Sequence, residues 1–507
     1  MKHLFFTALL LLGLGSAQAQ LTQLQRTELE INESGTDNQQ AMGPYGILLF
    51  GNLSNNDKFN YEITHYDTTF KKVATKQFNA PTKNYLVAKL VSPDAQTLHL
   101  LFQRKKNLTI YSYNLANGSL KTTGVKLAKS NLISSGTLLG NYLYVETTIK
   151  KMPFVSMIDL ETGRNTGVVL PIKTPLAQIK SMVANHEKGI LTVSVQGGYS
   201  KKDVRKTHFE LFFFDAGKTQ PSESIPVENE RGKSTIDALV TWQGSESFLV
   251  SGTYSLDKDV LANGMYLALF EKGRQQWIRY HNFGDMANFF TYMKKKNQAK
   301  AEKAVQKKKE KGKENPIEVL MANHEVERLA NQYVLIAERY YPTYTQMIQT
   351  YMVNGQMQTR TIVVFDGYEY THAVALGLDQ QGNKLWDHCF ELENVGKPYV
   401  VVKNVKKLSS TNDIRVFYPT KTNFKAMRIS GDSGISSRDL GSIAPENPDA
   451  KVKWSSGLNA QHWYDDYVLV SGMQRIKEEE GRKKRRTVFF LSKLKLNADK
   501  SFDGKTE

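Results

Sequence analysis

The residues His372–Trp386 (HAVALGLDQQGNKLW) hold the clearest copy of a unit that recurs along this chain. The unit is a strand with central aliphatic residues, a turn of Asp, Asn or Gly, and a second, more polar strand. Further copies lie at Leu108–Leu120, Phe154–Asn165, His208–Thr219, Met265–Trp277 and Phe424–Leu440. Self-similarity at a steady interval indicates a repeat architecture built from one supersecondary unit.

A short apolar strand precedes several of the units, as in Phe248–Gly252 (FLVSG) and Tyr467–Gly472 (YVLVSG). Together these segments divide the chain into about eight spans: 33–78, 82–127, 130–172, 175–227, 234–283, 317–393, 398–443 and 452–502. Four strands of about five or six residues with their turns fill roughly 40–50 residues. The longer spans therefore contain insertions.

Four-stranded sheets placed radially around an axis bury both faces of every sheet, and this is the simplest solution for such a repeat. The run Leu24–Ile31 is expected to complete the last unit as its outer strand and to close the ring. The first and last spans can also share one blade, so we expect an all-β propeller with seven or eight blades. Two or three packed β-sandwiches are the alternative.

The pattern resembles the β-propeller superfold, and Leu378–Trp386 is similar to the repeats of quinoprotein-like propellers. Gly273–Trp277 matches these repeats in part. The matching positions are turn and packing positions, so the resemblance implies a fold and transfers no quinone or calcium ligand. No specific family is identified.

Composition describes an ordinary globular protein, because 40% of the 507 residues are hydrophobic and 23% are charged. Residues 1–19 read as a cleaved signal peptide with a basic start, an apolar stretch at Leu4–Leu14 and an Ala17-Gln-Ala19 site. We expect residues 20–507 to form a single exported propeller domain without a transmembrane segment. The single cysteine, Cys389, excludes an internal disulfide, which suits a periplasmic or cell-surface protein.

Two insertions break the rhythm of the repeat. Residues 285–316 read as a Lys-rich helix that Asp285 caps, with an apolar stripe at Met286, Phe289, Phe290 and Met293. Residues 340–367 read as a protruding β-hairpin, because Asn354-Gly355 separates two strand-like runs. We expect both insertions near one rim, either as a contact surface or as cover for the neighbouring blade.

The candidate binding residues all lie in these two insertions. They are Lys294, Lys295, Lys296, Lys307, Lys308, Lys309, Tyr340, Tyr341, Tyr344 and Tyr351. Tyrosines offer large contact areas, while lysines attract anionic lipid or glycan, or simply solvate an exposed face. Much of the formal charge of +17 lies in 294–314 and 475–486, and 294–315 holds no aromatic residue, which disfavours nucleic-acid binding.

No catalytic motif, metal-ligand spacing or cofactor-binding loop is found in the sequence. His388 and Cys389 are neighbours in a predicted strand and point to opposite faces, which argues against a catalytic pair. His462-Trp463-Tyr464 is either a carbohydrate-binding cluster or interblade packing. We therefore predict a non-enzymatic binding or scaffold protein of the cell envelope that contacts a protein or an anionic surface through its insertions. The alternative is a glycan hydrolase or lyase with an axial active site.

Overall fold

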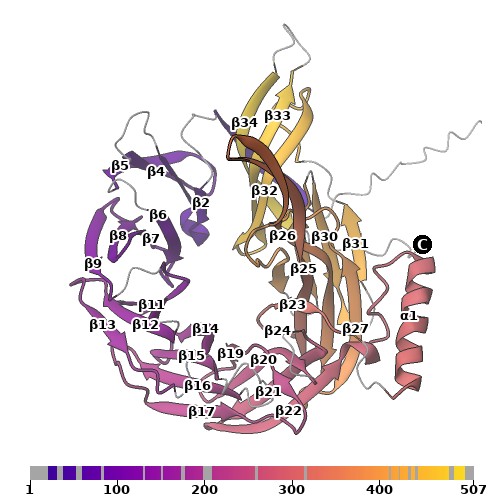
Figure 1. Ribbon diagram of the computed structural model, residues 1–507. Coiled ribbons are helices and arrows are strands. Elements are labelled where there is room, and N and C mark those ends of the chain that lie inside the picture. Colours follow the sequence, from indigo (N-terminus) through magenta and orange to yellow (C-terminus); the bar gives the residue numbers. More distant parts are fainter. Residues whose placement is uncertain are drawn as a thin grey trace, which may run out of the picture.

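The structure, a computed structural model, describes residues 21–30, 38–52, 60–80, 85–128, 132–149, 152–172, 177–197, 208–256, 261–312, 317–409, 413–421, 423–431, 435–439, 443–478 and 485–496. These residues form eight antiparallel sheets arranged around a central axis (Figure 1). The predicted all-β propeller is thereby confirmed. The expected signal peptide, residues 1–19, lies outside the described residues.

The first four sheets follow one another along the chain, and each pairs its strands in sequence order. The first sheet contains β2 (Asn38–Ala41), β3 (Ile47–Asn52), β4 (Asn60–Tyr66) and β5 (Lys72–Asn79). The second contains β6 (Tyr85–Val91), β7 (Thr97–Arg104), β8 (Asn107–Asn114) and β9 (Leu120–Lys126). The third contains β10 (Ser135–Leu139), β11 (Tyr142–Ile149), β12 (Met152–Asp159) and β13 (Asn165–Val168). The fourth contains β14 (Gln178–Asn185), β15 (Ile190–Gly197), β16 (His208–Asp215) and β17 (Glu223–Val227).

The next two sheets each have a split first strand. The fifth sheet contains β18 (Ser234–Thr235), β19 (Leu239–Trp242), β20 (Ser247–Ser255), β21 (Gly264–Glu271) and β22 (Arg274–Asn282). The sixth contains β23 (Leu320–Asn323), β24 (Glu327–Leu329), β25 (Gln332–Val353), β26 (Gln356–Leu378) and β27 (Lys384–Glu391).

The last two sheets complete the ring. The seventh contains β28 (Lys406–Ser409), β29 (Ile414–Pro419), β30 (Phe424–Ile429) and β31 (Ile435–Asp439). The eighth contains β32 (Lys451–Tyr464), β33 (Tyr467–Lys477), β34 (Arg485–Leu496) and β1 (Leu21–Glu30). Strand β1 pairs antiparallel with β34 from Leu21 opposite Leu496 to Glu30 opposite Val488, so the N-terminal strand is the outer strand of the last sheet.

Each sheet packs against both of its neighbours. Among the described residues, eight buried apolar clusters each combine residues of two consecutive sheets. The cluster that closes the ring joins Ile47 and Leu49 of β3 to Trp463, Leu469 and Leu491 of the eighth sheet. Burying an aliphatic or aromatic side chain of this size contributes about 1.5–3 kcal/mol, so the sheet contacts stabilise the ring without disulfides.

Position within a sheet explains the sequence pattern. The second strands, such as β20, are buried along nearly their whole length, because a neighbouring sheet covers each face. The outer strands, such as β17, alternate between buried and exposed residues. Figure 1 shows β14 facing the axis and β17 at the periphery. Continuous apolar runs therefore mark the interior strands and alternation marks the rim.

The tryptophan of the recurring unit packs on the turn of the next sheet. Trp277 of β22 lies against Gly382, where an added Cβ would stand 2.6 Å from the indole. Gly382 has a φ of +78° and belongs to the turn that the Asp379 carboxylate caps through the N–H groups of Gln381 and Asn383. The repeat motif is thus structural, as its turn and packing positions imply.

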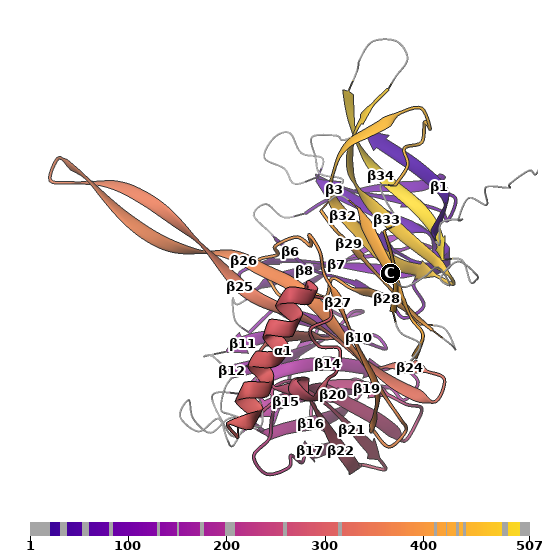
Figure 2. The ribbon, with the colours of Figure 1, turned by 90° about the vertical axis from the view of Figure 1, so that its right-hand side faces the viewer.

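The two insertions have different placements. Helix α1 (Lys295–Glu310) lies against the outer wall beside β27, whereas β25 and β26 continue past their sheet as a long hairpin that leaves one face of the ring (Figure 2). Both predicted insertions are present.

The predicted start of the helix is wrong. Asp285 ends a 3-10 turn (Phe283–Asp285), and the residues up to Lys294 form turns before α1 begins. The cause is Asp387, whose carboxylate accepts the backbone N–H groups of Ala287 and Asn288 at 3.2 and 2.7 Å. The segment still docks, because Met286 and Phe289 are buried in the cluster between the fifth and sixth sheets. Asp285 instead pairs with Lys309 at 2.8 Å.

Candidate interaction site

The outer part of the hairpin, residues 344–365, is named the arm. Its strands pair from Tyr344 opposite Phe365 to Val353 opposite Gln356, and Asn354 and Gly355 form the turn with φ of +50° and +80°. Two consecutive positive φ values are the type I′ geometry that an Asn-Gly pair favours. The hairpin turn is therefore where the sequence places it.

Neither edge of the arm has a partner strand among the described residues. Strand β23 pairs with β25 only as far as Tyr340, and β27 pairs with β26 only as far as His372. Figure 2 shows the arm extending well beyond the ring. Ten residues in each strand span about 33 Å.

The arm's surface is apolar and nearly free of charge. Ile348, Met352 and Tyr344 expose 75%, 73% and 62% of their surface, and Met347, Tyr351, Met357, Val363 and Val364 are exposed as well. Arg360 is the one charged residue in the arm sequence, and its guanidinium donates to Gln349 Oε1 at 2.9 and 2.7 Å. Exposed apolar patches of this extent on soluble proteins mark interaction sites or aggregation liabilities.

The root of the arm is anchored by the loop 395–402, which joins β27 to β28. The Tyr370 hydroxyl donates to Val402 O at 2.7 Å and accepts from Val402 N, and Tyr368 N donates to Pro398 O. Lys397 forms ion pairs with Glu369 at 3.2 Å and Asp366 at 3.6 Å. Burial is the largest cause that raises the pKa of Tyr370, to about 12, so its hydroxyl remains a protonated donor. These contacts fix the direction in which the arm leaves the ring.

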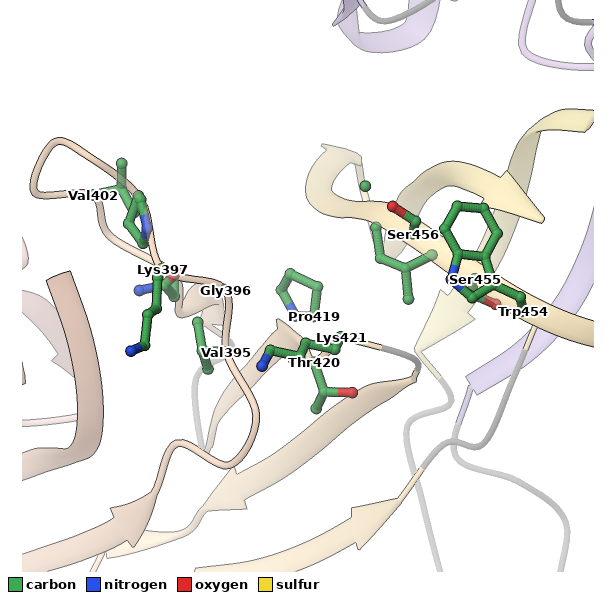
Figure 3. A pocket seen from close by; sticks show the side chains of 14 residues that line it. Val395, Gly396, Lys397, Val402, Pro419, Thr420, Lys421, Trp454, Ser455 and Ser456 are labelled. Carbon is green, nitrogen blue, oxygen red and sulfur yellow. The ribbon is translucent and has the colours of Figure 1, made fainter. Parts of the chain in front are cut away.

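A pocket of about 580 Å³ lies on the other side of this loop (Figure 3). The loop 395–402 forms one wall, the turn at Pro419–Lys421 forms the floor, and the start of β32 at 454–458 forms the opposite wall. Trp454 exposes 47% of its surface, and Val395, Val402 and Leu458 add further apolar lining. Lys421 supplies positive charge, whereas Lys397 forms its ion pairs with Glu369 and Asp366.

The arm and this pocket belong to the same face of the ring. In a sheet of four antiparallel strands, the turn between the second and third strands lies on the same side as the connection from the fourth strand to the next sheet. The arm and the turn at Pro419–Lys421 are connections of the first kind, and the loop 395–402 is one of the second kind. We call this side the arm face.

The predicted tyrosines divide into two groups. Tyr344 and Tyr351 are exposed on the arm, whereas Tyr340 and Tyr341 lie at its root. Tyr340 packs against Tyr368 and Tyr370 with ring centroids 5.3 and 5.9 Å away, so its role is to support the arm. The structure therefore brings the four tyrosines to one hairpin but leaves only two of them on its protruding part.

The predicted lysines lie on the outer wall. Lys294, Lys295, Lys296, Lys307 and Lys308 are exposed, and Lys309 is half-buried through its ion pair with Asp285. The half-buried residues Gln298, Ala301, Val305 and Lys309 form the stripe that faces the protein. Lys307–Lys309 lie in the last turn of α1, where positive charge stabilises the helix dipole. Lys307–Lys309 thus have a structural role in addition to any binding role.

Several exposed apolar residues of the arm face were not among the sequence candidates. They are Ile348, Met357, Val363, Tyr399, Val400, Val401 and Trp454. The run Tyr399–Val401 lies at the start of the predicted span 398–443 and follows Gly396 and Pro398, which is a signal for an exposed loop. The exposure of Trp454 had no local signal, because the residue lies in a strand-like segment.

Two carboxylates of the fifth and sixth sheets are used in structural hydrogen bonds. The Glu338 carboxylate is fully buried and accepts from His324 Nε2 at 2.7 Å, from Val405 N at 2.9 Å and from Asn404. The Asp237 carboxylate accepts from Thr253 N at 2.6 Å and from Asn323 Nδ2. Burial raises the pKa of Asp237 and lowers the pKa of His324. Both carboxylates hold neighbouring segments in place.

The remaining sequence candidates for chemistry are also structural. Burial raises the pKa of the Cys389 thiol well above its usual range, which keeps it protonated and unreactive. His388 bonds instead to Gly431 O at 2.9 Å. Trp463 is buried, donates to Gly46 O at 3.0 Å and stacks on Phe70, so it belongs to interblade packing. Within the described residues, no three of His, Cys, Asp and Glu gather in an arrangement that could hold a metal ion.

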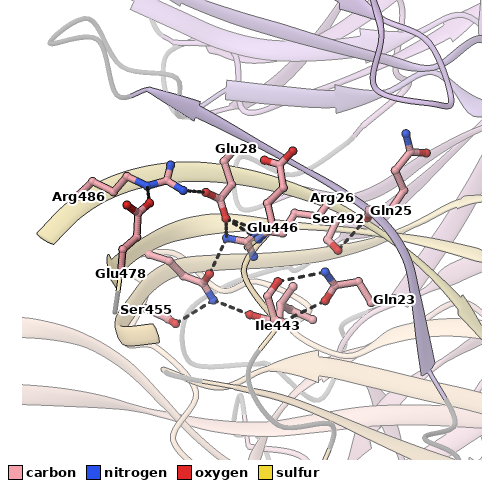
Figure 4. Close-up of polar contacts among 12 residues, drawn as sticks. Gln23, Gln25, Arg26, Glu28, Ile443, Glu446, Ser455, Glu478, Arg486 and Ser492 are labelled. Carbon is pink, nitrogen blue, oxygen red and sulfur yellow. Dashed lines mark hydrogen bonds and ion pairs between the residues drawn. The ribbon is translucent and has the colours of Figure 1, made fainter. Parts of the chain in front are cut away.

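A buried polar network lies where β1 joins the eighth sheet (Figure 4). Glu28 accepts from Arg26 at 2.9 Å, from Arg486 at 2.5 Å and from Glu446 N at 2.9 Å. Arg26 also donates to Gln474 Oε1 at 2.8 Å and covers the ring of Phe490. Because these contacts bind the first strand to the last ones, we assign the network to ring closure and name it the clasp.

No protein-family model matches the chain, and no curated protein matches it. Solved structures give remote matches, and the three that follow have TM-scores below 0.5. The Dos1 propeller is 10% identical, with a TM-score of 0.38, covering 82% of this chain and 93% of its own. The polysaccharide lyase Uly1 is 8% identical, with a TM-score of 0.37 and coverages of 83% and 91%. A prolyl endopeptidase is 10% identical, with a TM-score of 0.39, and this chain covers 56% of it.

The matched structures include enzymes as well as a propeller named without an enzymatic activity, so they assign no function to this chain. In the part of the chain that the structure describes, no helix has the length and apolar character needed to cross a membrane.

Proposed function

We propose that this protein is a non-enzymatic binding protein that captures a protein partner on the arm face. The observation that carries the proposal is the arm: ten exposed rungs of a two-stranded ribbon with one charged residue in 344–365. Contact between apolar side chains and water is unfavourable, and a partner that covers these side chains lowers the free energy of the system. The rigid ring holds the root of the arm and so fixes where the partner is presented.

The pocket beside the arm supports the same function. Its apolar walls and the exposed Trp454 offer an anchor site for a partner side chain, and Lys421 offers positive charge at its rim. Tryptophan and other large aromatic residues dominate the energetics of many protein interfaces. Arm and pocket together form one continuous contact face, because Phe365 of the arm also contacts Tyr399 of the loop, with ring centroids 6.1 Å apart.

We further propose that the protein acts after export, in the cell envelope, and that α1 lies toward an anionic lipid or glycan surface. The support is the signal-like sequence of residues 1–19 and the exposed lysines of α1. N-terminal sequencing of the protein recovered from the envelope fraction tests the first point. The proposal predicts Gln20 as the first residue, and an intact Met1 in cytoplasmic protein contradicts it.

The central test uses a photo-crosslinking amino acid in living cells. We expect crosslinks to another protein chain from position 352 on the arm. Val73 on β5 is the matched control, because it is also an exposed apolar strand residue, with 56% of its surface accessible, and it lies in a different sheet. Equal crosslinking from both positions, or none from position 352, contradicts the proposal.

A second variant removes the arm without cutting the sheet. Thr343 and Gly367 are opposite one another in the β25–β26 register, so an Asn-Gly turn between them replaces residues 344–366. We expect unchanged folding and loss of partner capture in a pull-down with the crosslinked partner. Capture that survives the replacement refutes the role of the arm.

A further inference from the structure

The arm leaves both edges of a two-stranded ribbon open over ten residues. An isolated hairpin is marginally stable in water, and three or more strands are needed for independent stability. Natural edges of this length are protected by Lys, Pro, bulges or a covering segment. Strand β25 has Pro342 and a register shift at Thr343/Tyr344 at its root, and then no proline and no charged residue up to Val353.

The two edges of the arm differ. The β25 edge, Tyr344–Val353 (YTQMIQTYMV), combines β-favouring residues with no charge, no proline and no glycine. This composition is the signature of segments that pair with identical segments. The β26 edge contains Arg360, whose positive charge opposes pairing of two identical β26 edges. The open edge suited to self-pairing is therefore that of β25.

A lipid bilayer is a less suitable partner for the arm than a second strand edge. The apolar residues would favour the hydrocarbon region, but the unpaired N–H and C=O groups of two open edges would each cost several kcal/mol there. A strongly charged partner finds no complementary charge on the arm beyond Arg360, which Gln349 already binds. An uncharged strand edge is the partner that satisfies both the backbone groups and the apolar side chains.

We propose that the arm pairs with the arm of a second copy of this chain, β25 against β25, to form a four-stranded antiparallel ribbon. This inference rests on the proposed function and names the protein partner as the protein itself. A two-fold contact of this kind uses the same patch on both copies. The register that pairs 344–352 completely places Ile348 at the two-fold axis, with Tyr344 opposite Met352 of the second copy.

The geometry also avoids charge repulsion between two basic bodies. Antiparallel arms place the two rings at opposite ends of the ribbon, separated by about the 33 Å length of the arm. The formal charge of +17 on each chain is screened over about 8 Å at physiological salt. The uncharged β25 edge of the arm is thus the part of the molecule on which two copies meet without opposing charges.

Proline at one edge or the other tests the pairing. Val353 and Gln356 flank the two-residue turn as a hydrogen-bonded pair, and bonded and non-bonded pairs then alternate, so Thr350 and Thr359 form a non-bonded pair. Both direct their N–H groups outward, Thr350 on the β25 edge and Thr359 on the β26 edge. Proline at either position leaves the bonds between β25 and β26 intact and removes one outward donor.

Sedimentation velocity over a concentration series measures the outcome on the full chain. We expect the wild-type protein to be dimeric, Thr350→Pro to raise the dimer dissociation constant at least about tenfold, and Thr359→Pro to leave it unchanged. A wild-type chain that stays monomeric at the highest concentration overturns the inference. Equal effects of the two prolines overturn the assignment to β25.

A cysteine crosslink gives a second measurement that does not depend on proline. The native Cys389 is buried, so Ile348→Cys offers one accessible thiol and Met357→Cys, on β26, is the control. A short bis-maleimide should link two chains at position 348 and not at position 357. If the chain is monomeric and the crosslinker at position 352 captures a different protein, the inference fails while the proposed function stands.

Discussion

The outer edge of β34 and the arm edge of β25 are both strand edges, and the chain treats them in opposite ways. Strand β1 covers β34 along the full length of Leu21–Glu30 and places Glu28 and Arg26 in the clasp with 2% side-chain exposure. Within the described part of the chain, no strand covers the arm edge of β25, and residues 344–353 include no charged side chain. The covered edge closes the fold, and the open edge is the one to which we assign the proposed partner.

Charged groups have different effects at the two strand edges. At the covered edge, buried charges fix the register of β1, because Glu28 satisfies Arg26, Arg486 and the backbone of Glu446 at the same time. At the open edge, charge would block pairing. The two strand edges thus have opposite compositions, with charged residues at the covered edge and uncharged residues at the open edge.

Breaking the clasp should have the largest effect on stability. Glu28→Ala leaves the buried Arg26 guanidinium without its carboxylate, and loss of one partner from a buried ion pair costs about 3–5 kcal/mol. Urea unfolding followed by circular dichroism measures the loss. The exposed Glu230, which pairs with Lys233, is the matched control, and Glu230→Ala should change stability by less than about 1 kcal/mol. Equal losses from the two variants would contradict the role of the clasp.

Acid should weaken the fold through histidines that burial keeps neutral. Burial lowers the pKa of His372 to about 3, and the positive charge of Arg339 lowers it further as a smaller cause. Burial also lowers the pKa values of His281 and His99 to about 4. The unfolded chain binds these protons below about pH 6.5, so stability falls as the pH drops from 6.5 toward 4. Each such histidine contributes up to about 1.4 kcal/mol per pH unit.

His372→Phe isolates one of these contributions at the last rung before the arm leaves the ring. His372 stacks on Tyr292 at 3.9 Å, so a phenylalanine keeps the aromatic contact while removing the titration. Urea midpoints measured between pH 7 and pH 5 should fall less steeply in the variant than in the wild type. Parallel slopes would show that His372 is not kept neutral by burial.

A milder change at the closing contact should have a smaller effect. Trp463→Phe removes the N–H that donates to Gly46 O and leaves a small void beside Phe70, for an expected cost of about 1–2 kcal/mol. Thermal unfolding measures this loss. Trp454→Phe is the control on the same strand, and its partly exposed indole predicts a smaller change. A larger loss at position 454 would contradict the assignment of Trp463 to ring closure.

Removal of the arm should have the smallest effect on the stability of the ring. Replacing 344–366 by Asn-Gly removes exposed residues together with two surface contacts to the loop 395–402, those of Phe365 with Tyr399 and of Asp366 with Lys397. Surface changes of this kind have small effects, and we expect a change below about 0.5 kcal/mol. The same thermal unfolding experiment checks this value. A large loss of stability would mean that the arm belongs to the folded core and is not an accessory to it.

Much of the fold was predictable because local patterns and global packing agree. The repeat spans match the sheets, and the placement of β1 follows from the need to close a ring with an outer strand from the N-terminal run. The hairpin turn was predictable because Asn354-Gly355 favours one backbone geometry. The start of α1 was not, because the deciding group is Asp387, about 100 residues further along the chain.

The site was predictable only in part. The tyrosine-rich hairpin is visible in the sequence, but the division of its residues into root and arm depends on how far β23 and β27 extend. The pocket is formed by the loop 395–402, the turn at Pro419–Lys421 and the start of β32, which belong to different sheets. Because these segments lie far apart in the sequence, no local sequence pattern predicts their contact. Burial in the assembled ring also raises the pKa of Asp237, which no local pattern indicates.

Hydrogen exchange measured by mass spectrometry across a dilution series tests the contrast between the covered and the open edge most directly. The account predicts that the peptide spanning β1 is protected at every concentration, whereas the peptide spanning 344–353 gains protection as the protein is concentrated. Exchange in 344–353 that is independent of concentration, or early exchange in β1, would contradict it.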